Sequence, residues 1–262
     1  MSFSAFGFEI QDGVAHITLN QPERGNPLDE CFCAEFNAIA TACASDPAVR
    51  AVLIDAKGRF FSVGGDLQSL TRDRADLARF VLSATANLHM GVARFARMRA
   101  PVIMAVHALA AGGAVALAAA ADFVLAAPGA AFYAAFTGIG ICGDSGTSHY
   151  LPRRVGPRRA AEFLILNETW SAQTAREAGL ITRVVEEDRL QIEALALAQK
   201  LADGPTRAFG EIKALLLDSP TRSLEAQLEQ EAHAMVRCVQ TEDAWNGMGA
   251  VKEKTKPAFE GR

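Results

Sequence analysis

The chain has 262 residues, of which 50% are apolar and 21% charged. A chain of this length and composition buries a substantial core and is typical of a soluble globular protein. Its formal net charge of −4 argues against a polyanion-binding face, so we expect no nucleic-acid partner. The five cysteines are odd in number and lack Cys-x-x-Cys spacing, which indicates free thiols and no metal set.

The N-terminal quarter predicts alternating strands and a helix. Residues 1–9 lack the basic start and apolar core of a signal peptide, so we expect a cytoplasmic protein. Asp12-Gly13 separates the strand-like runs 8–11 and 15–19 and predicts a hairpin. Apolar residues at helical spacing predict a helix over 28–44, followed by a strand over 49–54. Strands alternating with helices indicate an α/β domain with a mainly parallel sheet.

Residues 101–127 are almost wholly apolar and long enough to span a bilayer. His107, Gly112-Gly113 and Asp122 interrupt the run, so we expect a buried strand, turn, helix and strand, and no membrane span. Beyond about Pro205 the pattern is helical only. We therefore divide the chain into a core, residues 1–200, and a helical C-terminal region, residues 201–262.

Two glycine-bearing segments each follow an apolar strand-like run and lead toward a helix. They are FFSVGGDL at residues 60–67 and VHALAAGGA at residues 106–114. Glycine at a strand-to-helix turn lets a ligand approach the backbone, and a helix start leaves N–H groups without partners. Two such turns side by side predict an oxyanion hole, in which two N–H donors bind one oxygen.

Four segments in order resemble the crotonase superfamily, the enoyl-CoA hydratase/isomerase family. Residues 60–67 resemble its F-S/A-A-G-x-D-L, and residues 106–114 its N-G-x-A-x-G-G-G. Residues 14–23 resemble V-x-x-I-x-L-N-R-P, and residues 171–181 resemble S-A-x-E-A-x-x-x-G-L-V. The resemblance implies a ββα spiral core, a helical C-terminal region that forms a trimer or a dimer of trimers, and an acyl-CoA substrate. Coenzyme A would be part of the substrate, with no retained cofactor.

The resemblance also assigns roles in the reaction. The oxyanion donors would be the N–H groups of Gly65 and Gly113, the latter at the start of a helix. The two glutamates of the family's hydratases correspond to Ala116 and Phe136, whose side chains have no group that can transfer a proton. This departure argues against hydration by a glutamate pair.

Asp144 is the remaining candidate acid–base group. It lies in residues 137–153, which resemble G-L-x-P-D-x-G-x-x-x-x-L-P-R of the phenylacetate-pathway epoxyphenylacetyl-CoA isomerase branch. It also resembles the aspartate of dienoyl-CoA isomerases. The residue is either a proton-transferring carboxylate or the N-cap of the following helix, where Asp is favoured. His149, five residues later, is a candidate partner for it.

The resemblance further assigns residues that bind the coenzyme A part of the substrate. Asp66 has a second interpretation, as the N-cap of the next helix. The assigned residues are Arg24, Asn26, Ser62, Val63, Gly64, Asp66, Leu67, Lys256 and Phe259.

These features favour an enoyl-CoA isomerase that uses a single aspartate and an enolate held by backbone donors. Two alternatives stay open: an enoyl-CoA hydratase-type lyase, and a catalytically silent acyl-CoA-binding member of the family. The loss of acidic residues at positions 116 and 136 favours the silent binder.

Overall fold

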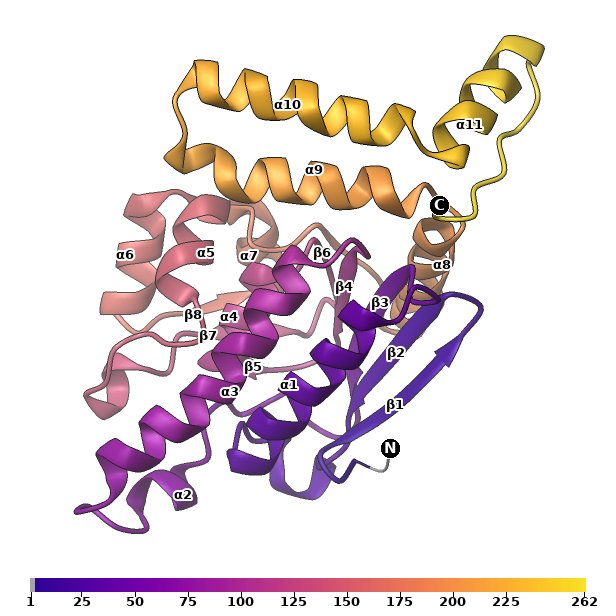
Figure 1. Cartoon of the computed structure of the whole chain (residues 1–262). Coiled ribbons are helices and arrows are strands. Elements are labelled where there is room, and N and C mark those ends of the chain that lie inside the picture. The colour runs from indigo at the N-terminus through magenta and orange to yellow at the C-terminus, as the bar shows by residue number, and fades with distance from the viewer. Residues whose placement is uncertain (1–2) are drawn as a thin grey trace.

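The computed structural model describes residues 3–262 (Figure 1). The strands in chain order are β1 (Phe6–Gln11), β2 (Val14–Leu19), β3 (Ala51–Ala56), β4 (Val102–Val106), β5 (Ala110–Ala111), β6 (Phe123–Ala126), β7 (Ala131–Tyr133), β8 (Thr169–Ser171) and β9 (Arg183–Val184). The helices are α1 (Glu30–Ser45), α2 (Leu67–Thr71), α3 (Leu77–Arg97), α4 (Gly113–Ala120), α5 (Thr147–Val155), α6 (Pro157–Ile165), α7 (Ala172–Ala178), α8 (Leu190–Ala202), α9 (Thr206–Asp218), α10 (Leu224–Val239) and α11 (Glu242–Glu253).

Six strands form the main sheet in the order β1-β2-β3-β4-β6-β9. β1 and β2 are the expected antiparallel hairpin, and the remaining neighbours are parallel. The hairpin turn works because Asp12 and Gly13 both take the left-handed φ that such a two-residue turn requires. The α/β class, the hairpin and the strand–turn–helix–strand unit from β4 to β6 are confirmed.

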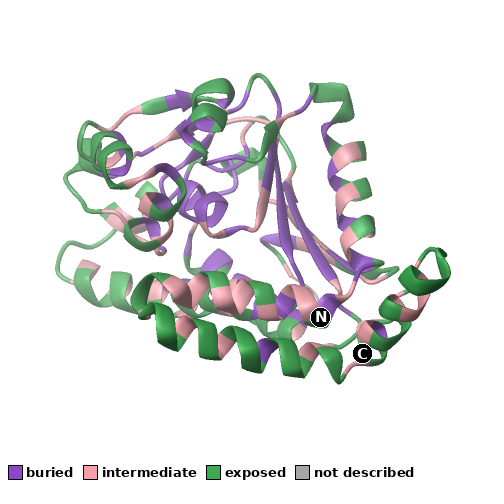
Figure 2. Cartoon of the chain, turned by 90° about the horizontal axis from the view of Figure 1, so that it is seen from above, coloured by how far each residue is buried: buried purple, intermediate pink, exposed green. Residues whose placement is uncertain are grey.

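Helices cover both faces of this sheet. On one face, Phe36 of α1 and Phe95 of α3 join a core with alternate strand residues such as Val52 and Ile54. On the other face, Ala194 of α8 joins a smaller core. The strands are therefore buried while the helices turn exposed faces outward (Figure 2). A second sheet, β5-β7-β8, lies beyond the carboxyl end of β4.

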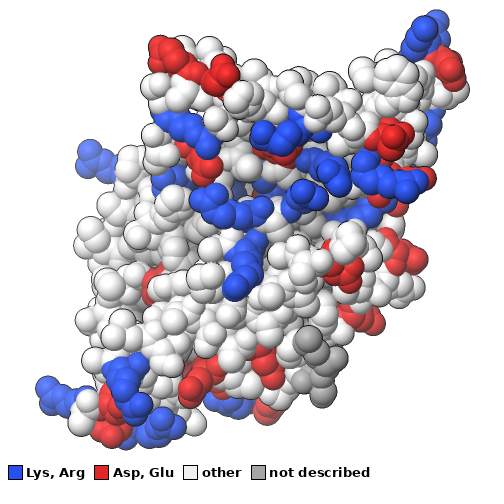
Figure 3. Space-filling view, in the orientation of Figure 1, with Lys and Arg blue, Asp and Glu red and all other residues white. Residues whose placement is uncertain are grey.

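The C-terminal helices α9, α10 and α11 lie together at one end of the molecule (Figure 1). α8 packs on the main sheet and ends at Ala202, one residue beyond the expected start of the C-terminal region. A band of Lys and Arg side chains crosses the molecule below these helices (Figure 3). Two ion pairs join α9 to its neighbours: Arg237 of α10 with Glu211, and Arg97 of α3 with Asp218. Within residues 3–262, no helix is long and apolar enough to cross a membrane.

Candidate active site

The two glycine turns follow the carboxyl ends of β3 and β4 and are joined by main-chain hydrogen bonds. Ser62 donates its N–H to the Leu109 carbonyl at 3.1 Å, and Ala111 donates to the Ser62 carbonyl at 3.0 Å. Gly64 takes a φ of +84°, and a side chain there would meet the Ala111 carbonyl oxygen at 2.8 Å. Glycine is therefore required because the two backbones touch.

Gly65 and Gly113 carry free N–H groups. Among residues 3–262, no acceptor binds either N–H. Gly113 is the first residue of α4, as expected, so the positive end of the helix dipole adds to its donor. Two unsatisfied donors on hydrogen-bonded turns are suited to stabilising a developing oxyanion.

Residues that precede the first turn hold it in place. Asn26 is 2% exposed, and its amide nitrogen donates to the carbonyls of Lys57, Phe60 and Phe61 at 2.9, 3.2 and 3.1 Å. The Ser62 hydroxyl donates to the Asn26 carbonyl at 2.7 Å. Both polar side chains are therefore bonded within the protein.

Asp144 lies opposite α3, where His89 Nε2 approaches its Oδ1 to 2.5 Å. Both side chains are partly exposed, 38% for Asp144 and 50% for His89, so a substrate can reach them. The N-cap of α5 is Gly146, which lies two residues beyond Asp144. The N-cap interpretation of Asp144 is therefore wrong.

The partner of Asp144 is His89, whereas His149 stacks edge-on against Tyr150. The expectation for His149 is therefore wrong. His89 is 55 residues from Asp144 in the chain and lies in no motif. Local sequence carries no signal for such a pair, because only the packing of α3 brings it together.

Ser145 turns the other way, toward the second glycine turn. Its hydroxyl would lie 3.3 Å from a Cβ placed on Gly113, and the residue is 1% exposed. Within the described chain this hydroxyl has no hydrogen-bond partner. Adjacent residues thus direct one side chain to His89 and the other to the candidate oxyanion hole.

A comparison with protein families agrees with this geometry. The model of the family described as enoyl-CoA hydratase/isomerase matches residues 9–262. The chain belongs to this family. The crotonase fold and an activity on acyl-CoA follow from membership, and the relatives include isomerases and hydratases.

Individual relatives cover nearly the whole chain. The 1,2-epoxyphenylacetyl-CoA isomerase of Escherichia coli (strain K12) is 33% identical over 97% of each chain. The 4-chlorobenzoyl coenzyme A dehalogenase-2 of an Arthrobacter species is 32% identical over 88% of this chain and 84% of the relative. The structure of a putative enoyl-CoA hydratase/isomerase from Mycobacterium abscessus has a TM-score of 0.92 at 36% identity, covering 98% of this chain and 100% of that one.

The two positions that the resemblance assigns to the hydratases' glutamates are apolar. Ala116 lies within α4 and is fully buried, and Phe136 is 6% exposed. Neither side chain can transfer a proton. Asp144 and its partner His89 are therefore the acid–base candidates beside the second turn, where the neighbouring Ser145 faces Gly113.

The residues assigned to coenzyme A differ in their accessibility. Val63 and Leu67 are exposed along the first turn, whereas Ser62 and Gly64 are buried. Asp66 caps α2, accepting from the Ser69 N–H at 3.2 Å, so its N-cap interpretation is confirmed.

Arg24 is already engaged by two carboxylates. Its guanidinium lies 2.6 Å from Asp29 and 3.3 Å from Asp66, and the hydrogen bond to Asp29 raises the pKa of Arg24. Because Asp29 caps α1 and Asp66 caps α2, Arg24 joins the starts of the two helices that flank the first turn.

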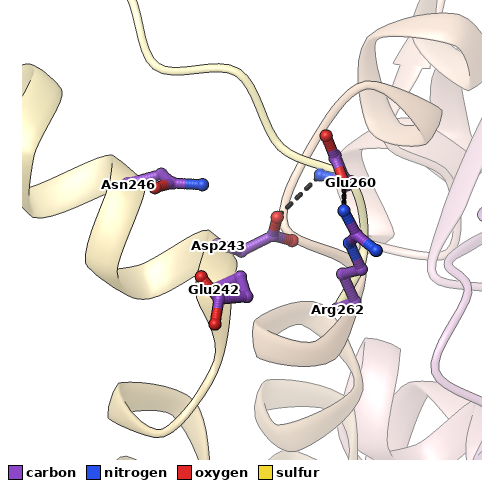
Figure 4. A pocket seen from close by; sticks show the side chains of 5 residues that line it. All are labelled: Glu242, Asp243, Asn246, Glu260 and Arg262. Atoms are coloured by element: carbon purple, nitrogen blue, oxygen red, sulfur yellow. Dashed lines mark hydrogen bonds and ion pairs between the residues drawn. The ribbon is translucent and has the colours of Figure 1, made fainter.

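Lys256 and Phe259 belong to the C-terminal tail, which lies away from the glycine turns in the single chain. Arg50, just before β3, donates to the Phe259 carbonyl at 3.0 Å, so the tail lies at the amino end of the parallel strands, opposite the glycine turns. Figure 4 shows how Asp243 holds the last residues, accepting from the N–H of Glu260 at 2.6 Å. The hollow beside it measures about 360 Å³ and is lined by Glu242, Asp243, Asn246, Glu260 and Arg262.

Metal ligands do not gather in the described part of the chain. Among residues 3–262, no group of three His, Cys, Asp or Glu side chains is arranged to hold a metal ion.

Proposed function

We propose that this protein is an enoyl-CoA isomerase that moves a double bond through an enolate. The N–H groups of Gly65 and Gly113 bind the thioester oxygen. Asp144 takes a proton from one carbon and returns it to another. The contact of 2.5 Å between Asp144 and His89 carries the proposal, since it leaves an accessible carboxylate beside a group that can hold it in position.

The energetic argument follows from the charge that develops. Removing a proton next to a thioester carbonyl places negative charge largely on oxygen. Each positioned backbone donor contributes about 2.7–4 kcal/mol to such a transition state. Gly113 contributes additionally through the dipole of α4. A single carboxylate is sufficient for a 1,3-proton shift, because the carboxylic acid that forms on taking one proton can exchange with solvent and then deliver a proton to the second carbon.

The remaining parts of the proposal concern binding and assembly. The exposed Val63 and Leu67 line the coenzyme A channel, together with Arg24. Lys256 and Phe259 reach the nucleotide end from a neighbouring subunit of a trimer, or of a dimer of trimers. Apolar residues exposed on the C-terminal helices favour such an assembly; they include Leu224, Leu228, Met235, Trp245 and Val251.

The Asp144–His89 pair also favours a second candidate, displacement of halide from a ring-bearing acyl-CoA. The Asp144 carboxylate attacks the ring carbon and halide leaves. His89 then takes a proton from a water that hydrolyses the resulting aspartyl ester. The dehalogenase relative supports this candidate.

The proposal is tested by incubating the protein in deuterated water with 2-enoyl-, 3-enoyl- and ring-bearing acyl-CoA esters and reading product masses. We expect deuterium gain and double-bond movement without added water. Addition of water identifies a hydratase-type lyase, and binding without any product identifies a silent acyl-CoA-binding protein. Either result overturns the isomerase proposal.

Variants assign the chemistry to residues. Asp144→Asn should nearly abolish turnover while acyl-CoA affinity persists, whereas Asp188→Asn, at an exposed position in the turn before α8, should behave like the wild type. With 4-chlorobenzoyl-CoA, His89→Gln separates the two candidates. A displacement enzyme accumulates a covalent aroyl adduct on Asp144, detectable by intact-protein mass, and an isomerase does not.

A further inference from the structure

We infer that Ser62, supported by Asn26, is a positioning residue for the Gly65 donor rather than a contact for coenzyme A. This assignment rests on the proposed oxyanion hole. Ser62 is fully buried and Asn26 nearly so, and their side chains bond within the protein. Neither side chain is therefore presented to a ligand.

The direction of the Gly65 N–H is set by the peptide between Gly64 and Gly65. A trans peptide is planar, so its carbonyl and its N–H point in opposite directions. The Gly64 carbonyl accepts from the Leu28 N–H at 2.8 Å. Holding the Gly64 oxygen on Leu28 thus directs the Gly65 N–H away from Leu28.

Ser62 restrains the other side of Gly64. Its Oγ accepts from the Gly64 N–H at 3.1 Å and donates to the Asn26 carbonyl at 2.7 Å. Gly64 has a φ of +84° and no side chain, so without restraint its two peptide planes rotate easily. The Ser62 hydroxyl and the Leu28 N–H together fix both planes.

Asn26 anchors this arrangement to the rest of the fold. Its Oδ1 accepts from the Gln21 N–H at 2.8 Å, and its Nδ2 donates to the carbonyls of residues 57, 60 and 61. Its own backbone is left-handed, with φ +53°. The acceptor for Ser62 is therefore the carbonyl of a residue that is itself immobilised.

Polarisation of a bound thioester measures the position of the donors without requiring turnover. The probe is butanoyl-CoA labelled with ¹³C at the thioester carbon, a saturated ester on which no double bond can move. Saturation with wild-type protein should shift the ¹³C resonance downfield. Ser62→Ala should bind the ester with similar affinity and lose most of that shift.

Turnover provides the second readout. With the ester that the wild type isomerises as substrate, Ser62→Ala should lower kcat by about tenfold or more. This is less than the roughly 100- to 1,000-fold effect of removing a donor outright. KM should change little, because ground-state binding does not depend on this alignment. Ser62→Thr, which keeps the hydroxyl, should recover part of the carbonyl shift.

Ser171→Ala is the matched control. Ser171 caps α7 by accepting from the Thr174 N–H at 3.1 Å, so its loss weakens the fold away from the glycine turns. It should leave the carbonyl shift intact. A wild-type shift in Ser62→Ala overturns the assignment.

The remaining outcomes separate this assignment from the proposals on which it rests. Absence of a shift in the wild type, or failure of the ester to bind, overturns the oxyanion hole and this assignment with it. A normal wild-type shift that Ser62→Ala loses, with no double-bond movement for any ester, supports the assignment and overturns the isomerase proposal alone.

Discussion

Ser62 and Ala110 form an isolated parallel bridge between the two glycine turns. Gly65 lies three residues after Ser62, and Gly113 lies three residues after Ala110. The bridge therefore sets the two chain segments in register, and the free N–H group of each segment lies three residues after its bridge residue. The spacing of donors in the candidate oxyanion hole is a consequence of this pairing.

The first prediction contrasts two adjacent glycines. Gly64→Ala should disrupt both turns, because its Cβ would lie 2.8 Å from the Ala111 carbonyl oxygen at a φ of +84°. Gly65→Ala meets only Leu70 Cδ1, at an ordinary 3.6 Å. We expect Gly64→Ala to lose about 1–3 kcal/mol of unfolding free energy, the cost of a strained backbone position, together with nearly all activity. Gly65→Ala should be nearly as stable as the wild type.

Urea denaturation of both variants checks this expectation. Equal urea midpoints for Gly64→Ala and the wild type would contradict this prediction. The two turns would then have moved apart to accept the new Cβ without any loss of stability.

The second prediction concerns Cys142, which is exposed two residues before Asp144. Burial raises the pKa of Cys33 and Cys43 to about 12, so these thiols stay protonated near neutrality. Iodoacetamide should modify Cys142 ahead of Cys33 and Cys43, and the adduct should block the site. Peptide mass mapping alongside residual activity measures both effects, and bound acyl-CoA should slow them. Cys142→Ser should stay active and resist inactivation; inactivation at the wild-type rate would place the sensitive thiol elsewhere.

Much of the scaffold was predictable because its signals are local. Asp12-Gly13 specifies the hairpin through its backbone preferences, and the glycines at 64–65 and 112–113 mark both turns. Gly113 was correctly placed at the start of a helix. Local chemistry was sufficient at these positions because the turn conformation itself requires the residue type.

The partner of Asp144 could not be predicted in the same way. His89 lies in the middle of α3, and nothing around it distinguishes it from any other polar residue on a helix surface. The N-cap interpretation of Asp144 failed because Gly146, in the left-handed conformation, is the N-cap of α5 instead. Both errors concern tertiary packing or backbone conformation that a side-chain preference does not report.

The residues assigned to coenzyme A show the same limit. The motifs place Ser62 beside the exposed Val63 and Asn26 close to the exposed Arg24, yet they do not say which side chains face inward. Their long-range hydrogen bonds, spanning 36 residues between the Ser62 hydroxyl and the Asn26 carbonyl, appear only in the folded chain.

The third prediction is a pH dependence of stability that originates at His16. His16 Nε2 lies 2.8 Å from Asp55 Oδ2, and this hydrogen bond raises the pKa of His16 above 6.5 against the opposing effect of burial. The folded state therefore favours the charged imidazolium. Its contribution to stability is fully present below pH 6.5 and is lost as the pH rises through the higher folded pKa.

Denaturation of the wild type and His16→Gln across this range tests the effect. The stability advantage of the wild type should shrink as pH rises from about 5.5 to about 8.5. A constant difference would show that the pair contributes no proton-linked stability.

The fourth prediction concerns the attachment of the C-terminal helices. Lys213 of α9 lies 2.7 Å from Asp122, and it also donates to the carbonyls of Phe95 and Ala100 at 3.1 and 2.9 Å. Its side chain is 9% exposed, and burial lowers its pKa. Lys213→Met leaves a partly buried carboxylate and two carbonyls without this partner. We expect a loss of about 3 kcal/mol, near the lower limit for breaking a buried ion pair because Asp122 keeps some contact with water.

Lys200→Met, at an exposed position on α8, is the matched control and should change stability by about 0.5 kcal/mol or less. Adding Asp122→Asn to Lys213→Met should restore part of the loss, because the carboxylate left without a partner is then neutral. Urea denaturation of the four proteins measures these differences. If Lys213→Met matched Lys200→Met, the docking of α9 would not depend on the buried ammonium, and the prediction would be wrong.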